Sequence, residues 1–159
     1  MGFMPRNIAI TGNTFERCSR CLPDPFHAGS AASLASVIAT AIIGPNRTEA
    51  SEPFQRVRYK GVHNITLAHN RISGWYRGPA IDLGDAADVS VYNNSISAPP
   101  PASVAMEPAI KVSDAERVAL DENELVGSWN SMSQAIQVEA GSTKQVTERG
   151  NRIRRELER

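Results

Sequence analysis

The chain has 159 residues, with 17 acidic and 17 basic side chains and a formal net charge of zero at pH 7. This length fits one domain, and the balanced charge excludes a general role in nucleic-acid binding, which requires a positive surface. The apolar stretch at residues 31–44 is too short to span a bilayer, so no membrane partner is predicted.

A local pattern recurs along the chain. Two apolar residues stand two apart, an Asn follows three residues after the second, and another apolar residue lies two beyond that Asn. The copies are centred on Asn13, Asn70, Asn94, Asn123 and, in degraded form, Asn151, and the last four follow one another at spacings of 24, 29 and 28 residues. Apolar residues two apart point to the same side of a strand, so each copy predicts a short strand with one face inward.

A second short strand is predicted between the copies, at residues 80–83, 109–112 and 135–138. Two strands plus turns in about two dozen residues are typical of one coil of a parallel β-helix, in which coils stack about 4.8 Å apart. The predicted fold class is therefore all-β, a parallel β-helix solenoid of about five coils over residues 1–153, followed by a charged tail at residues 154–159.

The recurring Asn has a structural interpretation rather than one as a sugar or metal ligand. It follows a strand at a corner, where we expect it to adopt the left-handed backbone conformation that Asn tolerates. Stacking the same corner coil after coil also predicts a ladder of hydrogen bonds between the amides.

This repeat resembles those of right-handed parallel β-helices in the pectin-lyase-like superfamily, over roughly residues 5–153. Residues 59–67 followed by Asn70-Arg71-Ile72 are also similar to segments of bacterial glycoside hydrolases, including the α-1,3-galactosidase group. The paired-aspartate and Gly-His-Gly signatures of polygalacturonases are absent, and Ala109 stands where their Arg-Ile-Lys element has its arginine. The resemblance implies a glycoside hydrolase or lyase that acts on a poly- or oligosaccharide, and no cofactor is predicted.

Long turn insertions interrupt the first coil, between Phe15 and the strand-like residues 37–43 and again at residues 45–60. Insertions of this kind usually build the functional face of a solenoid. Cys18 and Cys21 form a lone Cys-x-x-Cys without a second pair, so they are interpreted as free or locally bridged thiols and no metal site is predicted.

Aromatic residues follow the Asn turn in two coils, at Trp75-Tyr76 beside Arg77 and at Trp129. They lie outside the alternating core pattern. One interpretation therefore places the two indole rings on the surface, about 10 Å apart, as a platform for sugar rings, with Tyr76 and Arg77 as further substrate-binding residues. In the alternative interpretation the rings cover the core at a turn.

Asp82, Lys111 and Gln137 are the outward positions of the second strand in three coils, so they should stack in a column. Asp82 is the leading candidate for a catalytic acid, with Lys111 as a substrate-binding cation. In a lyase, Lys111 or Arg77 would instead remove a proton. The alternative is a surface ion pair that contributes at most about 1 kcal/mol.

Asp85 and Asp114 share a turn position in neighbouring coils, where their carboxylates would lie about 5 Å apart. That separation is compatible with the carboxylate pair of a retaining glycosidase. Ala140 is expected at the equivalent position of the next coil, so the column would end there. The preferred interpretation is that both residues form turns, since Asp bonds its own backbone in such places.

Five coils would stack to only about 20–25 Å, and the first copy begins close to Met1, without room for an N-terminal cap. We therefore expect a piece of a longer solenoid, or a homo-oligomer that covers the exposed end. Localisation stays open, because a truncated start would carry no information about a secretion signal. The competing hypothesis for function is a non-catalytic scaffold or adhesin-like binding module.

Overall fold

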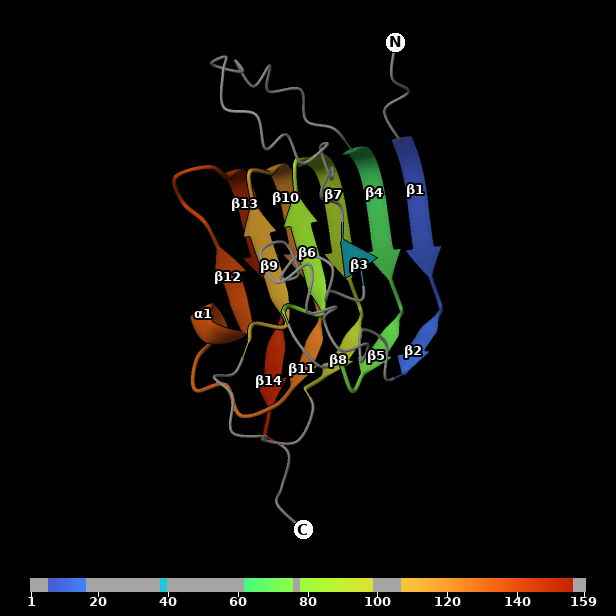
Figure 1. Ribbon diagram of the computed structural model, residues 1–159, viewed down its shortest axis with the longest axis vertical. Helices are drawn as coiled ribbons and strands as arrows, with labels where there is room; N and C mark the ends of the chain where they lie inside the picture. The colour runs from blue at the N-terminus through green and yellow to red at the C-terminus, as the bar shows by residue number, and fades with distance from the viewer. Residues whose placement is uncertain (1–5, 17–37, 40–61, 76–77, 99–106, 156–159) are drawn as a thin grey trace, which may run out of the picture.

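The computed structural model describes residues 6–16, 38–39, 62–75, 78–98 and 107–155 (Figure 1). The described part is all-β, as predicted: three parallel sheets and one short helix, α1 (Met132–Ala135). No helix within it is long and apolar enough to cross a membrane.

Sheet 1 contains the long strands, hydrogen-bonded in the order β1-β4-β7-β10-β13. Their bounds are β1 (Arg6–Thr11), β4 (Val62–Ala68), β7 (Ala86–Tyr92), β10 (Glu116–Asp121) and β13 (Lys144–Arg149). Every pair in this sheet is parallel, so segments that are far apart in the sequence lie side by side (Figure 1).

Sheet 2 follows directly after sheet 1 along the chain, in the order β14-β11-β8-β5-β2. Its strands are β2 (Thr14–Glu16), β5 (Arg71–Ser73), β8 (Ser95–Ser97), β11 (Glu124–Val126) and β14 (Arg152–Arg154). The apolar residue two beyond each repeated Asn lies on these strands. Each of the first four repeats therefore supplies three strands where the sequence predicted two, and the last supplies β13 and β14 among the described residues.

Sheet 3 has the order β12-β9-β6-β3, and its strands follow those of sheet 2 along the chain. Its strands are β3 (Ile38–Ala39), β6 (Ile81–Gly84), β9 (Ile110–Ser113) and β12 (Ile136–Val138). One passage of the chain through the sheets is called a coil below. This arrangement is compatible with a β-helix-like solenoid.

The core is a set of stacked apolar columns between the sheets. In sheet 1, Leu67, Val91 and Leu120 pair in register and are 0% exposed. Burying each such side chain contributes roughly 1.5–3 kcal/mol. At the two ends the same column continues as half-buried Ile10 and exposed Glu148.

The predicted Asn ladder is confirmed. In each coil after the first, the Asn Oδ1 accepts hydrogen bonds from the backbone N–H and the Nδ2 of the Asn one coil earlier, at 2.9–3.3 Å. The Nδ2 groups also donate to strand carbonyls of the preceding coil, for example from Asn94 to the Leu67 carbonyl at 2.9 Å. The three central rungs, Asn70, Asn94 and Asn123, are buried.

The expected reason for the Asn is wrong. The left-handed residue at this corner is the one immediately before it, and these residues, with φ between 52° and 67°, are Gly12, His69, Asn93, Glu122 and Gly150. The repeated Asn is therefore suited to its position by the hydrogen bonds of its side chain and not by its tolerance of positive φ.

A second left-handed position recurs in all five coils, inside the long strands of sheet 1. Its residues, with φ of 54–58°, are Asn7, Asn64, Asp88, Arg117 and Gln145, and they are called the kink column below. The pairing register skips each of them: between β7 and β10, for example, Ala87 pairs with Glu116 and Val89 with Val118. All five are exposed, so the kink column forms a ridge on the outer face of sheet 1.

Candidate functional site

The outer face of sheet 3 carries the predicted column. Asp82 pairs in register with Lys111, and Lys111 pairs with Gln137. Asp82 and Lys111 are half-buried and Gln137 is exposed, whereas the residues on either side of Asp82 are buried. The predicted stacking of these three residues is therefore confirmed.

Lys111 has a partner that the sequence interpretation missed. Its Nζ lies 3.1 Å from Glu139 Oε1, and both side chains are partly exposed. The Glu139 N–H donates to the Val112 carbonyl at 2.9 Å, so the pairing with β9 continues one residue beyond β12. The alternation of side chains along a strand could have identified this partner, because Glu139 stands two residues after Gln137 and therefore lies on the same face.

The fold changes the protonation of the Asp82 carboxyl. Burial is the largest cause and raises the pKa of the Asp82 carboxyl. The positive charge of Lys111 opposes that rise, and the negative charge of Glu139 adds to it. A carboxyl that retains its proton to higher pH is suited to act as a general acid.

Asp85 and Asp114 lie at the turn between sheets 3 and 1, with φ of 53° and 48°. The Asp85 carbonyl accepts the Val62 N–H at 3.2 Å, and the Asp114 N–H donates to Ser142 Oγ at 2.9 Å. This geometry fits the turn interpretation. In the next coil, the residue that contacts Asp114 is Ser142, and the equivalence with Ala140 stays a prediction.

The two Trp rings are buried, with Trp75 3% and Trp129 2% exposed, so the predicted surface platform is wrong. Their indole N–H groups donate to the carbonyls of Gly78 and Glu107, each at 3.0 Å. The rings pack against the hydrophobic core, as the alternative interpretation expected. Tyr76 and Arg77 lie outside the described residues.

Sheet 1 has an open groove of about 410 Å³ on its outer face, which the sequence interpretation also missed. One wall is the kink column from Asn64 to Gln145, and the small outward residues Ser90, Ala119 and Thr147 belong to the floor. The full lining is Asn64, Asp88, Val89, Ser90, Arg117, Val118, Ala119, Gln145 and Thr147. A constant spacing in the sequence could have identified the kink column, since each of its residues stands six positions before a ladder Asn.

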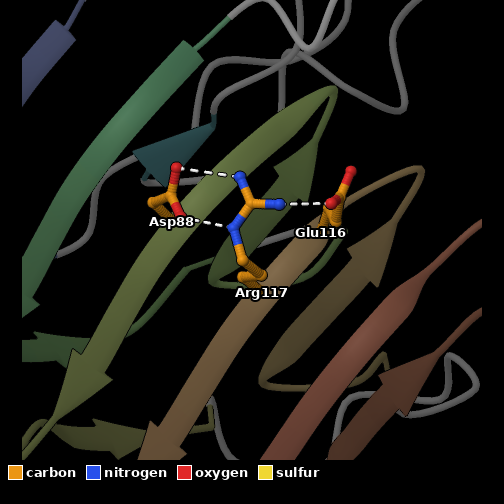
Figure 2. A network of polar contacts seen from close by, with 3 residues as sticks. All are labelled: Asp88, Glu116 and Arg117. Carbon is orange, nitrogen blue, oxygen red and sulfur yellow. Dashed lines mark hydrogen bonds and ion pairs between the residues drawn. The ribbon is translucent and has the colours of Figure 1, made fainter.

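An ion-pair network forms the middle of that wall (Figure 2). Arg117 holds Asp88 with two hydrogen bonds, from Nε at 2.6 Å and from Nη2 at 3.0 Å, and its Nη1 donates to Glu116. The hydrogen bond from Arg117 lowers the pKa of Asp88. With two carboxylates on one guanidinium, the network presents hydrogen-bonding groups but no excess positive charge to a ligand.

Within the described residues, no group of three or more His, Cys, Asp or Glu side chains is placed to hold a metal ion. Cys18 and Cys21 lie outside that part of the chain. No protein-family model, curated protein or solved structure matches this chain.

Proposed function

We propose that the chain is a segment of a right-handed parallel β-helix of the pectin-lyase-like type, and that it hydrolyses a glycosidic bond in an oligo- or polysaccharide. The stacked coils and the continuous Asn ladder support the fold assignment. The outer face of sheet 3 is the candidate active site. Trp75 and Trp129 have no part in this proposal because their rings are buried.

The observation that carries the proposal is the half-buried Asp82 beside the Lys111–Glu139 ion pair. Glycoside hydrolysis uses two carboxyl groups, one that protonates the leaving oxygen and one that is ionised. Asp82, with its raised pKa, takes the role of the acid. Glu139, held by Lys111, takes the role of the carboxylate that activates water or stabilises the positive charge of the transition state.

Hydrolysis fits this site better than elimination. A lyase needs a base that is free to reach the substrate, whereas the Lys111 side chain is engaged in an ion pair with Glu139 at 3.1 Å. One Lys beside two carboxyl groups also gives the face no positive charge with which to bind a uronate. The site therefore favours a neutral sugar as substrate.

Asp82→Asn tests the assignment, because the amide retains the shape of the side chain and cannot donate the acid proton. We expect the release of reducing ends from a panel of neutral oligosaccharides to fall by about 10²–10⁴-fold. The matched control is Gln137→Asn, which alters the same column outside the proposed acid pair and should retain activity within about threefold.

Two results would contradict the proposal. Undiminished reducing-end release by Asp82→Asn would remove Asp82 from catalysis. Unsaturated products, detected by ultraviolet absorbance, would establish elimination in place of hydrolysis.

The groove on sheet 1 favours a second candidate function, that of a non-catalytic glycan-binding module. Its amides, hydroxyls and carboxylates can exchange hydrogen bonds with sugar hydroxyls without any acid of raised pKa. Ala119→Trp would fill the groove floor, with Ser97→Trp on sheet 2 as its control. This function would be favoured over hydrolysis if the wild-type chain binds a glycan without releasing any product, and if Ala119→Trp abolishes that binding while Ser97→Trp does not.

A further inference from the structure

The groove on sheet 1 repeats one geometric unit in four successive coils. Its wall carries one exposed polar side chain from each of them, namely Asn64, Asp88, Arg117 and Gln145. The strands that carry these residues pair directly with one another, so the side chains recur at the inter-strand distance of about 4.8 Å. The wall therefore presents hydrogen-bonding groups in a row about 14 Å long, which follows the stack of coils and crosses the strands.

The floor of the groove follows the same direction. Ser90 pairs in register with Ala119, and Ala119 pairs with Thr147, so the three outward side chains form a continuous row beside the wall. None of these side chains is larger than that of a threonine. A ligand in the groove would therefore lie against methyl and hydroxyl groups and exchange hydrogen bonds with the wall.

The charged middle of the wall is already ordered without a ligand (Figure 2). The hydrogen bonds of Arg117 to Asp88 and Glu116 use three of the five N–H donors of the guanidinium group. The remaining donors and the free lone pairs of the carboxylates suit a hydroxyl group, which both donates and accepts. A polyanion is disfavoured, because the three side chains together carry no excess positive charge.

The interval between coils selects among extended ligands. An extended peptide places the side chains of one face roughly 6.6 Å apart, which is out of step with the coil spacing of about 4.8 Å. A single nucleic-acid strand would require a positive groove. The rings of a glycan with diequatorial (1→4) linkages follow one another in a nearly straight line at an interval close to the coil spacing, whereas α-(1→4)-linked glucans curve away from such a line.

We propose that the groove on sheet 1 binds an extended neutral glycan with diequatorial (1→4) linkages, which lies along the stack with about one ring per coil from β4 to β13. This inference rests on the second candidate function and adds to it the class of glycan, its direction and its length. Asn64 and Gln145 hold the two ends of the bound segment, and the Asp88–Arg117 pair holds its middle. A glycan therefore gains contacts with each added ring up to about four rings and none beyond.

Isothermal titration calorimetry with cello-, manno- and xylo-oligosaccharides of two to six rings tests the proposal. The titrations use the Asp82→Asn chain, so that hydrolysis on sheet 3 does not consume the probe. In at least one series the affinity should rise by about tenfold or more from the disaccharide to the tetrasaccharide and then stay constant. Malto-oligosaccharides of equal length should bind at least about tenfold more weakly, and Ala119→Trp should abolish binding.

A substitution at one end of the wall tests the direction of the glycan. Gln145→Ala should weaken binding of the tetrasaccharide by about threefold or more and leave the disaccharide unaffected, because a disaccharide still fits beside the other wall residues. Gln137→Ala, which removes an exposed Gln from sheet 3, is the matched control and should change neither affinity. Circular dichroism verifies that all variants are folded.

The possible failures are distinguishable. Equal affinity for the disaccharide and the tetrasaccharide, equal binding of malto-oligosaccharides, or an unaffected Gln145→Ala variant would overturn this proposal and leave the groove as a glycan-binding site. Absence of binding in all three series, or binding that Ala119→Trp leaves intact, would overturn the proposal together with the second candidate function.

Discussion

At the scale of single residues, the ladder holds the same Asn side chain in two environments, buried in the central coils and exposed in the first. Asn94→Ala would leave the buried N–H and Nδ2 of Asn70 without their acceptor and the Leu67 carbonyl without its Nδ2 donor. Because unsatisfied buried groups carry their full desolvation cost, we expect a loss of about 2–4 kcal/mol in the free energy of unfolding.

Urea denaturation monitored by circular dichroism measures this loss. Asn13→Ala is the control, since the Asn13 side chain donates within the ladder but its Oδ1 accepts nothing from a described residue, and the substitution should cost less than about 1 kcal/mol. Equal costs for the two substitutions would show that the ladder contributes little.

Asp82 gives a second prediction at this scale, on pH and stability. Because its pKa is raised in the folded chain, the native state binds its proton more tightly than the unfolded state, and ionisation above that pKa destabilises the fold. Asp82→Asn should therefore raise the melting temperature at neutral pH. The gain should disappear below the ordinary pKa of an aspartate, where the wild-type residue is protonated in both states.

Scanning calorimetry across pH measures this difference. Asp88→Asn is the control of opposite sign, since the pKa of Asp88 is lowered by Arg117 and its substitution should slightly reduce the melting temperature at neutral pH only. A melting temperature of Asp82→Asn that stays at or below the wild-type value at every pH would contradict the interpretation that burial raises the pKa of Asp82 and destabilises its ionised form.

At the scale of elements, the packing of Trp129 explains why the turn after β11 requires a glycine. A Cβ on Gly127 would lie 2.6 Å from the Trp129 ring and 3.0 Å from the Cβ of Ala98. The indole is fixed by its bond to the Glu107 carbonyl, so it cannot move aside at low cost. We expect Gly127→Ala to lower the free energy of unfolding by about 1–3 kcal/mol.

The same substitution at Gly141 is the control, because a Cβ there would meet no atom within 4 Å. Thermal denaturation should show Gly141→Ala close to the wild type or slightly more stable. Unchanged stability of Gly127→Ala would mean that the ring and the turn separate easily.

The elements also show what the sequence could predict. Apolar residues with period two predicted the strands of sheets 1 and 3, because a strand exposes alternate side chains to the core. The three-residue strands of sheet 2 are too short for such a period. The kink column was missed because Arg117 and Gln145 are poor residues for positive φ, and only their stacking on Asn7, Asn64 and Asp88 reveals the position.

The candidate site was predictable to the same extent. Asp82 and Lys111 follow from strand register, but Glu139 lies just beyond the end of a strand and its pairing depends on the turn that follows. The burial of Trp75 and Trp129 had no signal in the pattern, since an aromatic residue in a turn can fold over the core or away from it.

At the scale of the whole molecule, the stack of coils predicts a gradient of local stability. In a stacked repeat each unit contacts only its neighbours, so an end coil has one interface where a central coil has two. Leu67, Val91 and Leu120 are fully buried, whereas Ile10 is half-buried and Glu148 is exposed at the same position in the end coils. Amide hydrogen exchange should therefore be slowest in β7, slow in β4 and β10, and fastest in β1 and β13.

The gradient at the last coil also depends on one side chain. Glu148→Val would replace a charge at the end of the core column with an apolar group that can pack on Leu120, so we expect slower exchange in β13 and no change in β1. Mass spectrometry of deuterated peptides, at concentrations low enough to prevent association, measures this local effect. Uniform exchange across all five strands of sheet 1 would contradict the nearest-neighbour argument, since it would mean that the stack opens as a single unit.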